Sequence, residues 1–107
     1  MKLGSYIAAA VDELNKRDLF AGKTNIQKMI YFALPVDLRK AFYRPYHYGP
    51  YSAEVQQAVS ALLKKGVLTQ TVKGFSLANN RTLNLEADPV AGRIQATADF
   101  FSKHGLR

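Results

Sequence analysis

Cysteine is absent from this chain of 107 residues. Its absence excludes disulfide bonds, thiolate metal sites and cysteine nucleophiles, and it is consistent with a reducing cytoplasm. Histidine is also scarce. His47 and His104 are the only two, and neither has a cluster of acidic residues beside it in the sequence. A metal site is therefore poorly supported, and we expect no cofactor.

The chain also lacks the sequence signatures of catalysis and of membrane insertion. It contains no glycine-rich phosphate-binding loop and no recognisable nucleophile motif, so we predict that it is not an enzyme. Asp12 and Glu13 interrupt the short apolar stretch near the N-terminus too early for a transmembrane helix, and no convincing cleavage site follows it. We therefore expect a cytoplasmic protein that does not cross a membrane.

Acidic residues are scarce in the central part of the chain. Between Leu19 and Leu85 there are nine lysines and arginines but only two acidic residues, and this stretch accounts for the whole net charge of +7. Such an uneven distribution favours one positively charged face. A positive face attracts nucleic acid, although a merely soluble basic surface produces the same composition.

Length and hydrophobic content predict one folded domain over residues 1–107 with a packed core. Apolar residues at helical spacing predict four helices, over residues 5–16, 24–34, 52–65 and 89–104. Alternating and aromatic stretches predict a small sheet from residues 44–48, 67–72, 75–77 and 81–85. The sequence thus predicts an α+β fold that is mainly α. Asp37–Phe42 adds at most one or two helical turns.

The predicted helices carry recognisable end signals. Thr24 and Gln27 have the spacing of a capping box at the start of the second helix. Ser52 is a good N-cap for the third helix, and Gly66 is placed to end it in the left-handed conformation. Asp88, which a proline follows, opens the last helix.

The third helix presents a polar, mostly uncharged outer face once its apolar stripe is subtracted. The members of this face are Ala53, Gln56, Gln57, Ser60 and Lys64. Glutamine can pair with the N6/N7 edge of adenine, and serine can contact base edges or phosphates. The same residues also suit an ordinary solvated helix face, so the pattern alone leaves both interpretations open.

A predicted hairpin over residues 69–81 follows the third helix, with Lys73 at its turn and Arg81 beyond it. A helix that leads directly into a hairpin is the layout of a winged helix, whose wing can contact phosphates or the minor groove. An edge hairpin with a solubilising lysine is the alternative. The candidate DNA-binding residues are Ser52, Ala53, Gln56, Gln57, Ser60, Lys64, Lys73, Arg81 and Arg44.

An aromatic cluster precedes the third helix. Its members are Tyr43, Tyr46, His47, Tyr48 and Tyr51. The rings could stack on single-stranded bases, or they could form a patch that binds a partner protein. They could also pack beneath the third helix and shield the sheet, and we favour this interpretation.

Residues 23–34, 46–52 and 59–68 together resemble winged-helix proteins related to the Panacea antitoxin domains and similar small uncharacterised prokaryotic proteins. The residues that carry the resemblance are Lys23, Gln27, Lys28, Tyr31, Phe32, Tyr48, Gly49, Pro50, Gly66, Val67 and Leu68. The resemblance implies a winged-helix fold. It implies either DNA binding or the binding of a protein toxin, because these relatives include regulators and antitoxins. The chain departs from the pattern because Asp37–Phe42 is short for the helix expected before the recognition helix.

Two functions are consistent with these features. The first is a regulator of transcription that binds double-stranded DNA through the helix over residues 52–65 and the wing over 69–81. The alternative is an antitoxin-type module that binds a partner protein, and a weaker third is an adaptor fragment of a larger assembly. The apolar stripe of the last helix predicts a homodimer through the first and last helices, with Ile94 and Phe101 near its centre.

Overall fold

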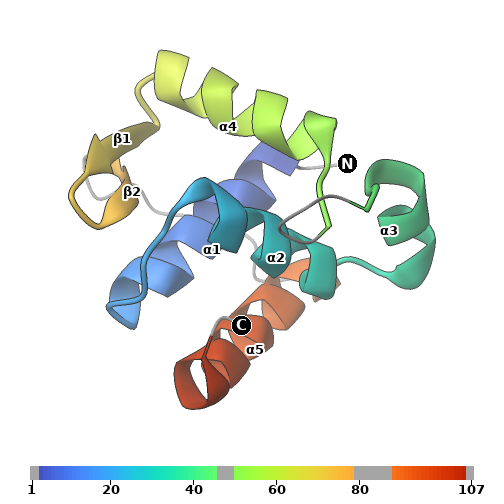
Figure 1. Ribbon diagram of the computed structural model, residues 1–107. Coiled ribbons are helices and arrows are strands. Elements are labelled where there is room, and N and C mark those ends of the chain that lie inside the picture. Colours follow the sequence, from blue (N-terminus) through green and yellow to red (C-terminus); the bar gives the residue numbers. More distant parts are fainter. Residues whose placement is uncertain (1–2, 46–49, 79–87, 106–107) are drawn as a thin grey trace.

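Five α-helices and one β-hairpin make up residues 3–45, 50–78 and 88–105, which are the residues that the computed structural model describes (Figure 1). In chain order they are α1 (Leu3–Lys16), α2 (Lys23–Ala33), α3 (Val36–Phe42), α4 (Ala53–Lys64), β1 (Leu68–Thr71), β2 (Gly74–Leu77) and α5 (Pro89–His104). The predicted α+β, mainly helical fold is confirmed. All four predicted helices are present, and α5 has the predicted bounds.

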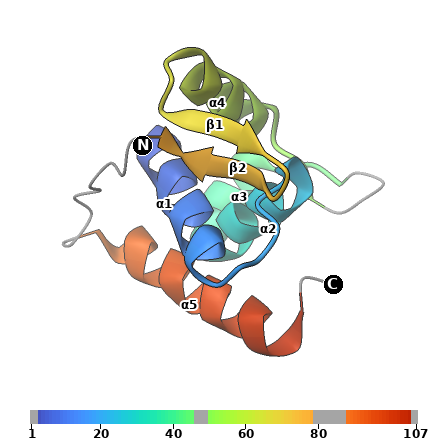
Figure 2. The ribbon, with the colours of Figure 1, turned by 90° about the vertical axis from the view of Figure 1, so that its left-hand side faces the viewer.

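The elements are arranged in three layers (Figures 1 and 2). Helices α1 and α2 lie in the middle, α4 lies across one side of them and α5 across the opposite side. Helix α5 packs against both α1 and α2, whereas α4 packs mainly on α1. The hairpin lies beside α1 at the C-terminal end of α4, and α3 lies near the opposite end of α4. The outer faces of α4 and α5 therefore point in opposite directions.

Helix α1 is the centre of the core because four other elements pack on it. Its neighbours are α2, α4, α5 and β2. The predicted stripe of Ile7, Ala10, Val11 and Leu14 is buried, and three consecutive alanines are buried around the helix as well. Small side chains let several neighbours approach the same helix closely. The other helices contribute Ile26, Met29 and Ile30, Val55 and Val59, and Ile94, Ala98 and Phe101 to the same cluster.

Three of the helix-end predictions are confirmed and one is wrong. The Ser52 hydroxyl accepts a hydrogen bond from the Val55 amide at 3.3 Å, Asp88 caps α5, and Gly66 is left-handed with φ 77°. The capping box is absent: α2 starts after Gly22, with no side-chain cap. Helix α2 begins one residue earlier than predicted, and the Gln27 amide points into the core, where it bonds to the Ser52 backbone.

Residues 36–42 form α3, which at seven residues has about two turns. None of its residues is fully buried, and only Leu38 and Phe42 pack, partly buried, against the core. Arg39 compensates, because its guanidinium donates hydrogen bonds to the carbonyls of Tyr31, Phe32 and Leu34 at the end of α2. Helix α3 is thereby attached to the C-terminal end of α2.

The sheet is smaller than predicted. Within the described ranges it consists of β1 and β2 alone, paired antiparallel with Leu68 opposite Leu77. The predicted strand over residues 44–48 begins at Arg44, which forms only an isolated antiparallel bridge with Tyr51. Pro45 and Pro50 lie next to these two residues, and a proline has no backbone amide with which to extend the pairing. Residues 46–48 and the predicted strand over 81–85 lie outside the described residues.

Ala21, in the connection between α1 and α2, lies alongside β2 in an isolated parallel bridge with Gly74. The Ala21 amide donates to the Lys73 carbonyl at 3.1 Å, and the Phe75 amide donates to the Ala21 carbonyl at 2.8 Å. Gly74 has φ 94°, and a Cβ atom there would lie 2.5 Å from the Ala21 carbonyl oxygen. Glycine is therefore required at this position, and the hairpin is fixed to the α1–α2 connection.

Candidate nucleic-acid interface

The outer face of α4 carries most of the predicted contact residues. Ala53, Gln57, Ser60 and Lys64 are exposed, and Gln56 is half-buried at the edge of the same face. The spacing of the exposed four brings them onto one side of the helix. Val55 and Val59 are buried on the other side. The structure therefore brings these five candidate residues together as a polar stripe.

Ser52 is the exception among the candidates on this helix. It is 0% exposed, and its hydroxyl is used as the N-cap of α4. Gln27 occupies its backbone groups: Nε2 of Gln27 donates to the Ser52 carbonyl and Oε1 accepts from the Ser52 amide, both at 3.0 Å. A serine that is covered in this way has no surface to offer to a base or a phosphate, so Ser52 positions α4 and does not contact DNA.

Gln27 and Tyr43 together fix the start of α4 against α2. Gln27 is only 5% exposed, and the Tyr43 hydroxyl donates a hydrogen bond to its carbonyl at 2.9 Å. Burial raises the pKa of Tyr43 well above its usual range, so the hydroxyl stays protonated and remains a donor. Neither role was predicted from the sequence. Their polar side chains sit among buried neighbours, and the partner of Gln27 is distant in the sequence.

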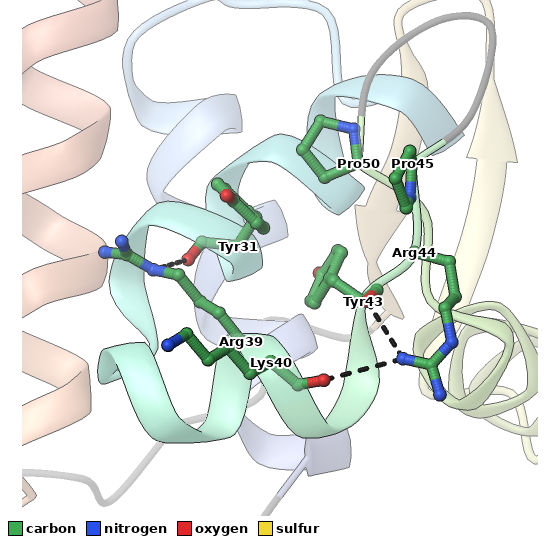
Figure 3. Close-up of a pocket in the computed structure, with 7 residues that line it drawn as sticks. All are labelled: Tyr31, Arg39, Lys40, Tyr43, Arg44, Pro45 and Pro50. Carbon is green, nitrogen blue, oxygen red and sulfur yellow. Dashed lines mark hydrogen bonds between the residues drawn. The ribbon is translucent and has the colours of Figure 1, made fainter.

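Arg44 lies beside the N-terminal end of α4. Its backbone pairs with Tyr51, one residue before the N-cap, through hydrogen bonds of 2.8 and 2.9 Å. Its exposed side chain donates to the carbonyl of Tyr43 at 3.1 Å and lies close to that of Lys40 (Figure 3). Among the described residues these bonds use one of its three nitrogens, which leaves the other N–H groups for a phosphate.

The hairpin lies at the opposite end of α4 and carries Lys73 in its turn. The Lys73 ammonium is 2.6 Å from the Asp18 carboxylate, and both side chains are exposed. The hydrogen bond from Lys73 and its charge lower the pKa of Asp18. An exposed ion pair of this kind is weak and screened by salt, so a phosphate can replace the carboxylate. Arg81, the last candidate, lies outside the described residues.

Some basic residues of the domain form ion pairs with carboxylates, and others do not. Near α1 and α5, Lys16 and Arg17 form ion pairs with Asp12, Glu13 and Asp99. Around α4, within the parts of the chain that the structure describes, no carboxylate lies within 4.0 Å of Lys40, Arg44, Lys64 or Lys65. These four basic residues lie on α4 and around its two ends, and Glu54 is the one acidic residue on the helix.

A cavity of about 430 Å³ opens beside the start of α4 (Figure 3). It is lined by Tyr31, Arg39, Lys40, Tyr43, Arg44, Pro45 and Pro50. Tyr43 from the predicted aromatic cluster is buried against Tyr31 of α2, with ring centroids 5.1 Å apart. Tyr51 is half-buried, and Tyr46, His47 and Tyr48 lie outside the described residues.

Residues of α2 and α5 line an apolar groove of about 360 Å³. Helix α5 lies on the opposite side of the molecule from α4 (Figure 1). The groove is lined by Phe32, Ala96, Thr97, Phe100 and Phe101. Phe32 is 49% exposed and Phe100 is 57% exposed. Ile94 and Phe101, the predicted centre of a homodimer interface, are 0% and 6% exposed because they pack in the domain's own core. The apolar side of α5 is already used by α1 and α2.

Within residues 3–45, 50–78 and 88–105, no three side chains of the metal-binding types gather closely enough to hold an ion. None of the helices described there has both the length and the apolar character that a bilayer crossing requires.

In comparisons with known proteins, no protein-family model, curated protein or solved structure matches the chain. Its function therefore has to be inferred from the residues themselves.

Proposed function

We propose that the domain is a winged helix that binds double-stranded DNA and regulates transcription. The observation that carries the proposal is the stripe of Gln57, Ser60 and Lys64 on the outer face of α4, where side chains suited to base edges are exposed together. Arg44 lies at one end of the helix and the hairpin at the other, so phosphate contacts are available on both sides of a groove.

The order of the elements supports the winged-helix assignment. Helix α4 is followed at once by the hairpin, as a recognition helix is followed by its wing. The Ala21 bridge adds one extended residue beside β2, between the first two helices. Helix α3 is inserted between α2 and α4, yet the two hydrogen bonds between Gln27 and Ser52 still join α2 to the start of α4.

The size and chemistry of α4 suit the major groove. Its 12 residues give a helix of about 18 Å, which is longer than the groove's width of about 12 Å. In this arrangement Gln57 pairs with adenine, Ser60 contacts a base edge, and Lys64 contacts a phosphate near the end of the helix. Arg44 and Lys73 add phosphate contacts that position the helix without selecting a sequence.

The apolar groove favours a second candidate function, an antitoxin-type module that binds a protein. Phe32 and Phe100 expose about half of their surfaces there. An exposed apolar patch is a common mark of a protein interface. A homodimer that pairs through the same groove would serve the first function instead, because paired copies match a palindromic site.

Fluorescence polarisation with the DNA upstream of the chain's own gene tests the first function. We expect affinity to fall steeply with salt, with a log–log slope of about −4 to −5 if about five phosphates are contacted. Binding that is absent at low salt, or that does not depend on salt, would contradict DNA binding. Light scattering at tens of micromolar then tests the dimer. A monomer that also fails to bind DNA would favour the protein-binding alternative.

A further inference from the structure

We propose that the cavity beside the start of α4 binds a small molecule in which a flat ring carries an anionic group, either a phosphate or a carboxylate. The cavity lies between α2, α3 and the chain that leads into α4, and its volume of about 430 Å³ is within the usual range for small-molecule sites. This inference does not depend on DNA binding, because the α4 stripe contributes none of the lining residues.

The lining is positively charged. Arg39, Lys40 and Arg44 contribute to it, and it includes no acidic residue. Figure 3 shows Arg39 and Lys40 on one side of the cavity and Arg44 on the other. Three cations without a carboxylate among them favour an anionic ligand, because an anion bound there meets attraction from both sides.

The three cations have different roles. Arg39 is held in place by its bonds to the carbonyls at the end of α2, and its guanidinium carbon lies 5.2 Å from the centroid of the Tyr31 ring. Arg44 has one nitrogen bonded to backbone carbonyls. The exposed Lys40 ammonium has no hydrogen bond or ion pair with any residue in the described ranges. Lys40 is thus the cation that can bind an anion without breaking another contact.

The remaining walls are flat and apolar. The rings of Tyr31 and Tyr43 pack edge to face, so each holds the other in one orientation. Pro45 and Pro50 add two further rigid rings. An inorganic anion would use only the cations and leave Tyr31 and the two prolines uncovered. A ligand with an aromatic ring covers them as well, which is why we expect the ring and the charge in one molecule.

The test is an NMR titration of the isotopically labelled full chain with four probes: adenosine 5′-monophosphate, benzoate, adenosine and inorganic phosphate. We expect at least one of the two ringed anions to bind about tenfold more tightly than both adenosine and phosphate, with shifts at the lining residues. The better of the two identifies phosphate or carboxylate as the preferred group. If phosphate alone binds as tightly, or if neither ringed anion binds at millimolar concentration, the proposal is overturned.

Two variants and one control make the test specific to this cavity. Lys40→Ala removes the unpaired cation and should weaken binding of the ringed anion about fivefold to tenfold. Tyr31→Leu removes a flat wall and should weaken it by a similar factor. Lys103→Ala changes an exposed lysine on α5 and should leave binding unchanged. Thermal melting verifies that each variant folds. If the folded Lys40→Ala chain binds like the wild type, the cavity is not the binding site.

Discussion

The two hydrogen bonds between Gln27 and the Ser52 backbone predict a large effect from a substitution that barely changes volume. Gln27→Leu keeps the core filled but removes both bonds, each worth about 0.5–1.5 kcal/mol net. It also leaves the buried Ser52 amide without a partner, whereas the Ser52 carbonyl keeps its bond from the Gln56 amide at 3.1 Å. An orphaned buried amide costs about 1–3 kcal/mol, so we expect a total loss of about 2–4 kcal/mol.

Urea denaturation of Gln27→Leu measures this loss, with Gln95→Leu as the matched control. Gln95 is exposed on α5, so its replacement should change the free energy of unfolding by less than about 0.5 kcal/mol. Amide exchange in Gln27→Leu should also be faster at the first turn of α4. A loss below about 0.5 kcal/mol for Gln27→Leu would refute the reasoning that these bonds fix the start of α4.

Three further predictions follow from single residues. Glu54→Gln removes the acidic residue of α4 and should strengthen DNA binding about twofold to fivefold at low salt; weaker binding would contradict a phosphate-facing helix. Gly74→Ala forces a Cβ atom against Ala21 and should destabilise the fold by more than about 2 kcal/mol in denaturant titration, whereas Gly92→Ala, which meets no atom, should stabilise α5 by about 0.5–1 kcal/mol. The Tyr43 pKa is raised above its ordinary value of 10.0, so the unfolded state loses the proton first and stability should fall as pH rises above about 10; Tyr43→Phe should lack this part of the decline.

Local signals predicted the helices well. Asp88 and Pro89 place the start of α5 correctly, and Ser52 and Gly66 mark the two ends of α4, because each acts on amides or carbonyls within one turn. The apolar stripes of the first and last helices likewise predicted their buried faces. Gln27 was predicted to belong to a capping box, but it forms a tertiary contact instead. A glutamine side chain suits both roles, so the sequence alone does not distinguish them. The actual partner of Gln27, Ser52, is 25 residues away.

The candidate interface was predicted only in part, since exposure depends on contacts between distant segments. Ser52 suits both a helix cap and a DNA contact, and only its burial beneath Gln27 decides between them. Ile94 and Phe101 form an apolar stripe that looks the same whether the domain's own core or a second copy covers it. The cavity could not be foreseen, because its walls come from α2, α3 and Pro50, and the position of α3 depends on the hydrogen bonds that Arg39 donates to the end of α2.

The claim that the outer face of α4 contacts bases is tested most directly by Gln57→Ala, with Gln95→Ala as the control on the opposite side of the molecule. Affinity is measured for the specific upstream DNA and for a shuffled sequence of equal length. The account predicts that Gln57→Ala loses about 1–3 kcal/mol on the specific DNA and almost nothing on the shuffled DNA, while Gln95→Ala changes neither. Equal losses on both sequences, or no loss from Gln57→Ala, would contradict it.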